Sequence, residues 1–579
     1  GLNASELANI AGALFILPFL LFSAPAGQFA DKYEKSGLMR AVKIIEILLM
    51  LIAGFAFVGN HFQILFIVLF LMGCQSTLFG PVKFAYIPQN LSTNELIGGN
   101  ALVESGTYLA IILGLLVGGL SVAIDPANRY VLSASLISVA VLGYIASRGI
   151  PETRPADPGL KVSWNLWTES WRIIGFAREK KSVFLSVLGI SWFWFFGTAI
   201  TLQIPAYTLD ILNGNETITT IVLVSFVVGV SLGALLCERL SGHRVELGLV
   251  PFGSFGLSVF AIDLYFAQPA LHPLAVSTLA ELLERPGSLR ILFDMAMLGA
   301  FGGLYSVPLY AMIQERATRQ QLSRIIAANN IINSLFMIAA AGLALVLLGS
   351  GISIPEFFAI LGLLNILVAI YIYTLLPEFL MRFVAWILIS VLYRIRVTGV
   401  DNIPAEGPAV LVCNHVSYAD AMIVGGSIPR PARFVMWYRI FDIPVLRFIF
   451  RHARAIPIAS AKEDETVLAA AYERIDEELA AGNIVCIFPE GAITRDGNVH
   501  EFRPGVEKIV RRRPVPVIPI ALTGMWGSWF SRRSNGSLRR LPGRLFARVD
   551  VRIGEPVKPA DASAAGLELL VRTLRGAGR

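Results

Sequence analysis

Residues 27–35 read Gly27-Gln-Phe-Ala-Asp31-Lys32-Tyr-Glu-Lys35, a charged segment between two long apolar runs at 7–28 and 40–59. An apolar run of about 20 residues is long enough to cross ~30 Å of hydrocarbon as a helix. The same alternation continues outward from this segment as far as residue 376, so the sequence predicts eleven membrane-spanning helices. They are residues 7–28, 40–59, 62–82, 98–123, 129–147, 181–205, 217–239, 246–267, 290–313, 325–348 and 354–376.

The composition agrees with a membrane protein. Of 579 residues, 55% are hydrophobic and only 15% are charged, whereas a soluble globular protein carries about 25% charged residues. This excludes ordinary soluble proteins, and the low charge also excludes a disordered tail. The four cysteines form no Cys-x-x-Cys or Cys/His pattern, so we expect buried thiols and neither a disulfide framework nor a metal site. They are Cys74, Cys237, Cys413 and Cys486.

Positive charge alternates between successive connections of the predicted helices. Five connections, at 28–40, 83–97, 148–181, 239–246 and 314–324, contain 16 Lys and Arg together. The intervening connections contain three. By the positive-inside rule the first set is cytoplasmic. The sequence therefore predicts that Gly1 lies outside and that everything after Leu376 lies inside.

An internal repeat predicts two similar helical bundles. Residues 81–105 resemble residues 308–334, at an offset that changes only from 227 to 229 residues. Each segment leads from one predicted helix through a predicted cytoplasmic loop into the next helix. Parallel repeats separated by a long loop are typical of two bundles that face each other across a cavity.

The segment Gly27 to Lys32 also fits a G-x-x-x-D-[RK] pattern. Together with the repeat, it resembles the signature that the major facilitator superfamily carries between its second and third helices. The resemblance implies a polytopic α-helical fold with 11 of 12 helices in this sequence, the first lying upstream of Gly1. We expect an N-terminal bundle at 1–147, a cytoplasmic loop at 148–180 and a C-terminal bundle at 181–376. Asp31 and Lys32 are expected to latch one conformation through ion pairs and helix dipoles; a solvated turn is the alternative.

Within that superfamily the chain looks most like the bacterial lysophospholipid transporters, in Phe79-Gly-Pro-Val-Lys83-Phe and Ala101-Leu-Val-Glu104-Ser105. Ionisable residues inside spans are costly, so they are candidates for function. A lipid headgroup would need such polar anchors. Lys43 could instead snorkel to the membrane boundary, and Lys83 could merely end its helix. The candidates are Lys43, Glu46, Lys83, Glu104, Asp263 and Asp294.

After Leu376 the composition changes. We expect residues 377–397 to form an interfacial or re-entrant membrane helix and residues 398–579 to form a cytosolic α/β domain. Asn414-His415-Val-Ser417-Tyr-Ala-Asp420 directly follows a predicted strand. Residues five apart point about 140° from each other on a regular helix, so a pair between His415 and Asp420 requires a turn. A histidine held by a carboxylate through one nitrogen can accept a proton with the other, which makes His415 a candidate general base.

Two further blocks follow at strand ends: Phe488-Pro-Glu490-Gly491-Ala-Ile-Thr494-Arg495 and Val515-Pro-Val-Ile-Pro519-Ile. With Asn414–Asp420 and Ala455–Ser460, they resemble the four blocks of the glycerolipid acyltransferases. The resemblance implies an acyltransferase with His415 as base on the acceptor hydroxyl and Asp420 as its orienting partner. Glu490, Gly491, Thr494 and Arg495 would bind the acceptor's glycerol-phosphate, and an arginine suits phosphate because its planar fork donates two parallel hydrogen bonds.

Two departures from the lysophosphatidate enzymes bear on the acceptor. The middle block ends in Ser460 where those enzymes usually have Arg, and Ala492-Ile493 separates Glu490-Gly491 from Thr494-Arg495. Both features look more like the acyltransferase of 2-acylglycerophosphoethanolamine salvage. They favour a phosphodiester acceptor such as lysophosphatidylethanolamine.

The reaction is expected to be direct, because no Gly-x-Ser-x-Gly or other nucleophile pattern is present and only Ser417 lies near His415 in sequence. The acyl donor would be a thioester, acyl-CoA or acyl carrier protein, with no bound cofactor. Basic residues near the end favour anionic lipid headgroups as partner, with acyl carrier protein or CoA phosphates as alternatives. No nucleic-acid partner is expected. These basic residues are Arg511, Arg512, Arg513, Arg532, Arg533, Arg539, Arg540 and Arg544.

The sequence thus predicts a bifunctional, multi-pass protein of a bacterial inner membrane. One half would bring lysophospholipid to the inner leaflet, and a cytoplasmic acyltransferase domain would reacylate it. Two alternatives stay open: a lysophosphatidate acyltransferase fused to a transporter of another substrate, and a transporter whose C-terminal domain binds lipid without catalysis.

Overall fold

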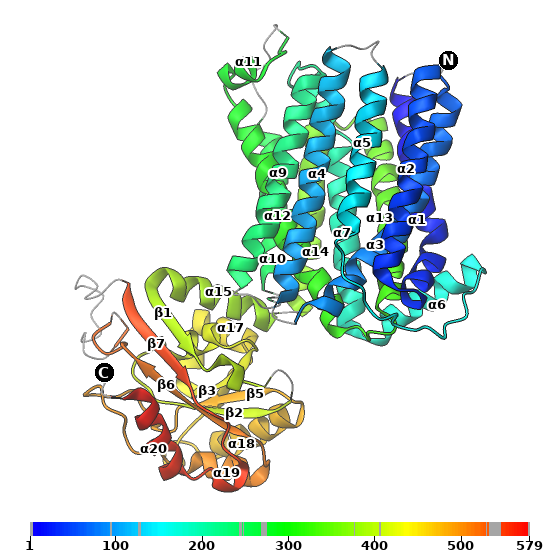
Figure 1. The fold of residues 1–579 in the computed structure, drawn as a ribbon. Helices are drawn as coiled ribbons and strands as arrows, with labels where there is room; N and C mark the ends of the chain where they lie inside the picture. The colour runs from blue at the N-terminus through cyan, green and yellow to red at the C-terminus, as the bar shows by residue number, and fades with distance from the viewer. Residues whose placement is uncertain are drawn as a thin grey trace. The chain divides into compact units, whose positions relative to one another are not determined.

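The computed structural model describes residues 4–92, 95–124, 129–241, 246, 248–267, 275–375, 377–404, 407–528, 530–531 and 546–576. The chain divides into two compact units, Gly1–Tyr371 and Ile372–Arg579, each described by itself. Figure 1 shows a bundle of long helices in the first unit and a sheet with helices on its faces in the second. The basic residues Arg532, Arg533, Arg539, Arg540 and Arg544 lie outside the described residues.

The first unit consists of long apolar helices, because a chain in hydrocarbon satisfies its backbone polar groups only within helices or closed barrels. Within the described residues, eleven helical spans are long and apolar enough to cross a membrane, α7 and α8 forming one of them. The predicted number of spans is confirmed. The helices are α1 (Ala4–Lys32), α2 (Lys35–Gly59), α3 (Phe62–Asn90), α4 (Leu96–Ile124), α5 (Arg129–Ser147), α6 (Leu166–Glu179), α7 (Lys181–Thr201), α8 (Ile204–Asp210), α9 (Glu216–Ser241), α10 (Leu249–Phe266), α11 (Leu279–Glu284), α12 (Ser288–Arg316), α13 (Leu322–Gly349) and α14 (Ile354–Leu375).

The two halves of the bundle meet at a buried pair of amides. Asn100 on α4 donates to Gln314 on α12 at 2.5 Å, and Gln314 donates back at 3.0 Å. The rings of Phe84 and Tyr310 stack beside them at 4.5 Å. Each of these pairs joins a residue of the first predicted repeat segment, or its flank, to one of the second. The repeat segments therefore form one of the contacts between the two halves.

The second unit is an α/β fold with a seven-stranded sheet in the order β1-β7-β6-β2-β5-β3-β4. All neighbouring strands are parallel except β6 and β7. The elements are α15 (Pro377–Leu392), β1 (Tyr393–Thr398), η2 (Val400–Asn402), β2 (Ala409–Cys413), α16 (Asp420–Ser427), β3 (Ala432–Trp437), η3 (Tyr438–Asp442), α17 (Pro444–His452), β4 (Ile456–Ile458), α18 (Glu465–Ala480), β5 (Ile484–Ile487), α19 (Gly505–Arg512), β6 (Val517–Thr523), β7 (Ala547–Ile553), η5 (Pro559–Asp561) and α20 (Ala564–Arg575).

Strand β2 lies between two hydrophobic cores. Leu411 and Cys413 face one core together with Ile389 of α15 and Ile423 of α16, whereas Val412 faces a second core built on α18, α19 and α20. All five residues of β2 are buried, as expected of a central strand covered by helices on both faces. The sheet therefore fixes the position of the residues that follow Cys413.

The segment 377–397 differs from the single helix predicted for it. Helix α15 ends at Leu392, and residues Tyr393–Thr398 form β1, which pairs in parallel with β7. The sequence Arg394-Ile-Arg-Val397 alternates polar and apolar residues with the period of a strand, and this period overrides the helical one. The sheet thus begins before residue 398, the predicted start of the α/β domain.

Helices α9 and α12 approach each other closely because both carry glycine four residues apart. These are Gly229 and Gly233 on α9 and Gly299 and Gly303 on α12. A Cβ atom added at Gly233 would lie 2.0 Å from the carbonyl oxygen of Ala300, a distance that no side chain tolerates. Small residues at this spacing let membrane helices pack backbone against backbone.

We predict that Gly233→Val lowers the stability of the helical unit, since overpacking of a tight core costs about 1–3 kcal/mol or more. The melting temperature of the purified protein in detergent should fall. Gly342→Val is the matched control, because a Cβ at Gly342 on α13 meets no atom within 4 Å. Equal melting temperatures for the two variants would contradict the close packing of α9 and α12.

Candidate functional site

The carboxyl ends of the parallel strands β2, β5 and β6 lie at one edge of the sheet in the second unit. The predicted site residues follow β2 and β5. Asn414 comes directly after β2 and bridges to β6. Its side chain donates to the Leu522 carbonyl at 3.0 Å and accepts from the Leu522 amide at 2.8 Å. This bridge holds the ends of the two strands together just where His415 begins the turn into α16.

His415 and Asp420 are brought together by the turn between β2 and α16. The His415 Nδ1 atom lies 2.9 Å from Asp420 Oδ2. The imidazole stacks on Phe488 with a centroid distance of 4.3 Å, and its side chain is 21% exposed. With Nδ1 bound to the carboxylate, Nε2 is the nitrogen that can accept a proton from a substrate hydroxyl.

Asp420 organises this turn. It is fully buried, and besides the imidazole it accepts hydrogen bonds from the Val416 and Ser417 amides and from the Ser417 hydroxyl. The Ser417 hydroxyl also accepts from the Ala419 amide at 3.1 Å. Ser417 is therefore buried and engaged in the turn, which does not suit a nucleophile.

Glu490 lies beside His415 and contacts backbone amides. Its Oε1 accepts from the His415 amide at 2.8 Å and its Oε2 from the His500 amide at 3.0 Å. Burial raises the pKa of Glu490, and the two backbone donors oppose that shift. The carboxyl group thus ties the loop after β5 to the start of the catalytic turn. Its role in binding glycerol-phosphate stays a prediction.

Thr494 and Arg495 differ in accessibility. Thr494 is buried, its amide donates to the His415 carbonyl at 2.9 Å, and its hydroxyl contacts Asp496 at 2.9 Å. Arg495 is exposed. Of these two, Arg495 is the one whose side chain a ligand can reach.

Sequence reasoning missed Arg503, which follows the same loop. Gly491 has a φ of +71°, and a Cβ there would lie 2.8 Å from the Arg503 guanidinium carbon. The Arg503 amide donates to the Pro489 carbonyl at 3.0 Å, which fixes its backbone against the loop. The signal in the sequence is Phe502-Arg-Pro-Gly505, a basic residue at the start of a helix that follows the Glu490 block. Arg495 and Arg503 are two exposed cations beside one loop.

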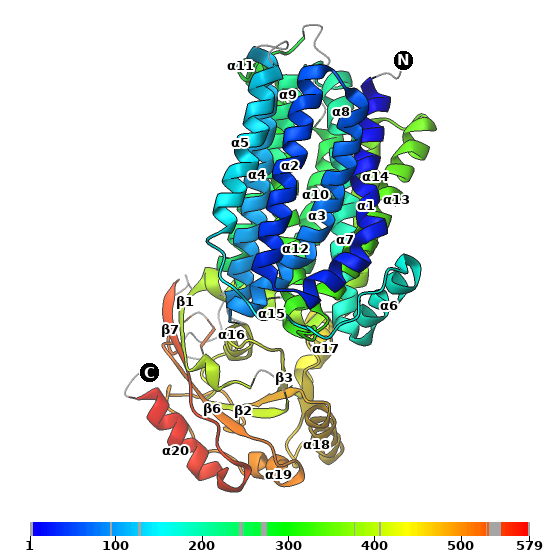
Figure 2. The ribbon, with the colours of Figure 1, turned by 45° about the vertical axis from the view of Figure 1, so that its right-hand side comes forward.

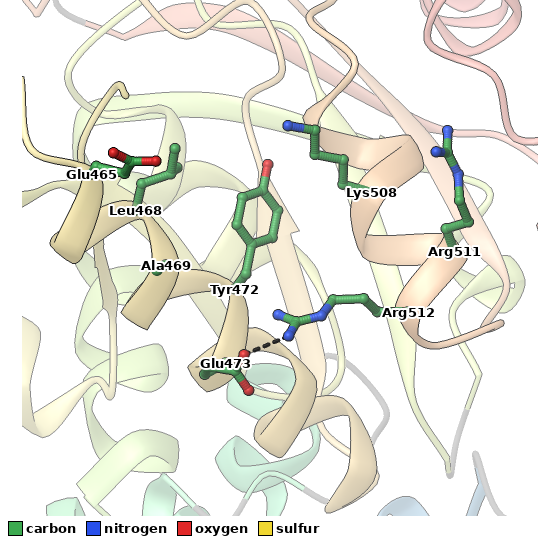
Figure 3. Close-up of a pocket in the computed structure, with 8 residues that line it drawn as sticks. All are labelled: Glu465, Leu468, Ala469, Tyr472, Glu473, Lys508, Arg511 and Arg512. Carbon is green, nitrogen blue, oxygen red and sulfur yellow. Dashed lines mark hydrogen bonds and ion pairs between the residues drawn. The ribbon is translucent and has the colours of Figure 1, made fainter. Parts of the chain in front are cut away.

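A groove of about 540 Å³ lies between α18 and α19 of the same unit (Figure 3). Arg512 and Glu473 pair across it, and Arg513 forms a bidentate pair with Asp476 at 2.8 and 2.9 Å nearby. Carboxylates of the neighbouring helix α18 therefore partly neutralise the basic run 511–513 that is predicted to meet lipid headgroups. None of the predicted catalytic residues lines this groove. Its lining is Glu465, Leu468, Ala469, Tyr472, Glu473, Lys508, Arg511 and Arg512.

Asp31 joins the two halves of the helical unit. It is fully buried at the end of α1, and its Oδ2 lies 2.8 Å from Arg324 Nε on α13. Its Oδ1 accepts from the Ser323 amide at 3.2 Å, in the first turn of α13. Asp157 adds a second contact to Arg324 at 3.4 Å. Lys32, in contrast, lies over the ring of Tyr33.

The other predicted transport residues form two separate groups. Lys83 donates to Thr107 at 3.3 Å and interacts electrostatically with Glu104, which is 8% exposed on α4. Asp263 on α10 pairs with Arg290 on α12 through two hydrogen bonds. Asp294 lies near that pair, 1% exposed.

The structure also describes the remaining candidates, the Lys43–Glu46 pair and the cysteines. Lys43 pairs with Glu46 at 2.7 Å, and Gln75 donates to the same carboxylate at 3.0 Å. Cys413 and Cys486 are buried free thiols, and burial raises the pKa of each. In the described part of the chain, no group of three or more His, Cys, Asp or Glu side chains converges to hold a metal ion.

Comparisons with protein families agree with the division of the chain into two units. The family model for the Major Facilitator Superfamily matches residues 1–283, and the model for Acyltransferase matches residues 394–523. The chain is a fusion of these two families. The second unit is an acyltransferase domain, and its family block contains His415, Asp420 and Glu490.

Relatives cover each part separately. Over 341 residues the chain is 28% identical to a lysophospholipid transporter of Klebsiella pneumoniae. This match covers 57% of this chain and 77% of the transporter. Over 142 residues the chain is 30% identical to a chloroplastic 1-acyl-sn-glycerol-3-phosphate acyltransferase of Arabidopsis thaliana. This match covers 24% of this chain and 39% of the plant enzyme. A solved 1-acyl-sn-glycerophosphate acyltransferase from Thermotoga maritima is 21% identical, covers 34% of this chain and 78% of that chain, and has a TM-score of 0.29.

We predict that Glu490→Gln reduces acyl transfer, because an amide nitrogen would then face the His415 or the His500 amide. Leaving a buried donor unpaired costs about 1–3 kcal/mol, and a displacement of the base by ~1 Å can lower the rate by about 10²-fold. Turnover by the purified full-length protein is the measurement.

Glu477→Gln is the control, because Glu477 lies exposed on α18 and pairs only with Arg474 among the described residues. A Glu490→Gln variant with the turnover of the Glu477→Gln variant would show that the two backbone bonds do not position His415.

Proposed function

We propose that the protein is a bifunctional lysophospholipid transporter and acyltransferase of a bacterial inner membrane. The major facilitator domain carries lysophospholipid to the inner leaflet, and the acyltransferase domain, on the cytoplasmic side, reacylates it to diacylphospholipid. Supporting this are the likeness to lysophospholipid transporters over 57% of the chain and the His415–Asp420 pair at 2.9 Å. Covalent linkage raises the effective concentration of one domain's product at the other domain.

The proposed reaction is a direct O-acyl transfer from a thioester. His415 Nε2 removes the proton from the acceptor hydroxyl, and the oxygen attacks the thioester carbonyl carbon. The carbon–sulfur bond breaks, and the departing thiolate takes the proton from the imidazolium. Asp420 stabilises that imidazolium through Nδ1. The donor is acyl-CoA or acyl carrier protein, and no bound cofactor takes part.

The proposed acceptor is lysophosphatidylethanolamine. Ser460 occupies the position where lysophosphatidate enzymes usually have Arg. Its hydroxyl donates a hydrogen bond to Glu463 at 3.0 Å, and it carries no positive charge. A lysophosphatidate acceptor is the second candidate, because Arg495 and Arg503 are both exposed at the loop beside Glu490. Profiling both acceptors with both thioester donors distinguishes the candidates.

We predict that His415→Ala abolishes acyl transfer and leaves lysophospholipid uptake into proteoliposomes nearly unchanged. Loss of a general base lowers the rate by about 10²–10⁴-fold. His452→Ala is the control, since His452 is an exposed histidine at the end of α17. Near-normal turnover of His415→Ala would remove His415 from the mechanism, and loss of uptake would mean that the domains are not independent.

We also predict that Asp31→Ala slows transport without changing the chemistry at His415. Removing this carboxylate removes the ion pair and the hydrogen bond that Asp31 makes from α1 to α13. It leaves Arg324 buried, with only Asp157 as carboxylate partner among the described residues. In vesicles fed lysophospholipid from the side opposite the acyltransferase domain, product formation should fall. In detergent, where acceptor reaches the enzyme without being carried, the rate should be normal.

Asp210→Ala, an exposed aspartate at the end of α8, serves as control for this pair of measurements. Equal loss of product in vesicles and detergent would indicate misfolding or coupling between the domains. Equal retention in both would contradict transport as the supply of acceptor.

A further inference from the structure

Helix α6 carries an uncovered aromatic face. Trp164 precedes the helix, Trp167 and Trp171 lie on it, and they are 70%, 75% and 68% exposed. Trp167 and Trp171, four residues apart, lie on one face of the helix. Tryptophan is enriched at membrane–water interfaces, where its ring lies among lipid and its N–H reaches water. Three adjacent indoles exposed to water would be unusual for a helix in the cytoplasm.

The opposite face of α6 is buried in the bundle. Ile173 and Ala177 have no exposed surface, and Ile173 packs with Ala24 of α1 and with Ala327 and Ile331 of α13. Ala24 lies eight residues from Lys32, where α1 ends, which corresponds to about 12 Å along the helix. This face therefore packs against two of the long apolar helices, inside the end of α1.

The position and charge of α6 fit the same interface. Figures 1 and 2 show α6 projecting sideways from the bundle, near the ends of α1 and α7. The helix and the residues just after it carry four exposed basic residues, Arg172, Arg178, Lys180 and Lys181. They outnumber the two acidic residues of α6, the exposed Glu179 and the buried Glu169, which pairs with Arg172 at 3.1 Å. Basic residues at this level attract the anionic headgroups of a cytoplasmic leaflet. Apolar rings on one face with cations near them are typical of an interfacial helix.

Helix α6 contacts Arg324 directly, and the residues just before it contact α1 next to Asp31. The Phe176 ring lies 5.3 Å from the Arg324 guanidinium, and the Trp164 ring packs on Phe29 at 5.7 Å. Gln28, three residues before Asp31, accepts from the Ser163 amide at 2.8 Å and donates to its carbonyl at 3.2 Å. Movement of α6 relative to the bundle would therefore disturb both α1 and α13 at the pair.

We propose that α6 is an interfacial helix. Its Trp167 and Trp171, together with Trp164 just before it, insert into the lipid of the adjacent leaflet and brace the Asp31–Arg324 pair. The partner is the lipid surface, with acyl chains around the indole rings and anionic headgroups at the basic residues. Separation of α1 from α13 then requires α6 to shift within the interface. The lipid composition of that leaflet would accordingly change the rate of alternation.

The location is tested with a fluorophore on the full chain in nanodiscs. Trp167→Cys, in a Cys74→Ser background, is labelled with an environment-sensitive nitrobenzoxadiazole group; the three remaining cysteines are buried. The label should lose most of its emission with lipid spin-labelled at acyl carbon 5 and less with lipid labelled at carbon 12, because interfacial helices insert about 5–10 Å. Arg319→Cys, on the exposed α12–α13 loop, should be quenched by neither.

Quenching at Trp167→Cys no greater than at Arg319→Cys would overturn the proposal, and a label shielded from both lipid and water quenchers would mean that protein covers this face. The bracing is tested by replacing all three tryptophans with Ser or with Phe. Uptake into vesicles should fall several-fold for Ser and recover with Phe, and unchanged uptake of the Ser variant would overturn the bracing. The uptake arm rests on the proposed transport function, whereas the quenching arm does not.

Discussion

The edge of the sheet that carries His415 depends on one carboxylate, Asp420, that has no contact with solvent. Asp420 accepts four hydrogen bonds, from the His415 ring, the Val416 and Ser417 amides and the Ser417 hydroxyl. Opening the turn would leave buried donors unpaired, at about 1–3 kcal/mol each. The turn is therefore rigid, and it delivers His415 from the end of β2 with one nitrogen bound and the other available to a substrate.

A buried carboxylate at the end of a helix has a different use in the major facilitator domain. Asp31 pairs with Arg324 and with the first turn of α13, and both charged groups are removed from water. The desolvation penalty offsets much of the attraction in such a pair, so it adds little net stability and mainly specifies one arrangement. That suits a contact between α1 and α13, which belong to the two halves of the bundle and separate in the proposed transport cycle.

Family resemblance and structure give Glu490 different surroundings. The resemblance implies contact with the acceptor, whereas the described contacts of both carboxyl oxygens are backbone amides, those of His415 and His500. Arg495 and Arg503 are the exposed cations beside the same loop. In the proposed reaction, Glu490 therefore positions His415 through its backbone amide. In the same reaction the two arginines bind the phosphate of the acceptor.

The sequence by itself determined the eleven spans, the two-domain fusion and the location of His415 and Glu490 just after strands, because hydrophobic length and local sequence blocks are properties of neighbouring residues. Only the tertiary structure decided which distant groups meet. Arg324 lies 293 residues from Asp31, and Arg503 reaches Gly491 only because the loop after β5 folds back. The tertiary structure also decided that residues 377–397 form a helix followed by a strand, because β7 pairs with Tyr393–Thr398 at the edge of the sheet. Pairing across such separations depends on helix packing and strand order, which no local pattern encodes.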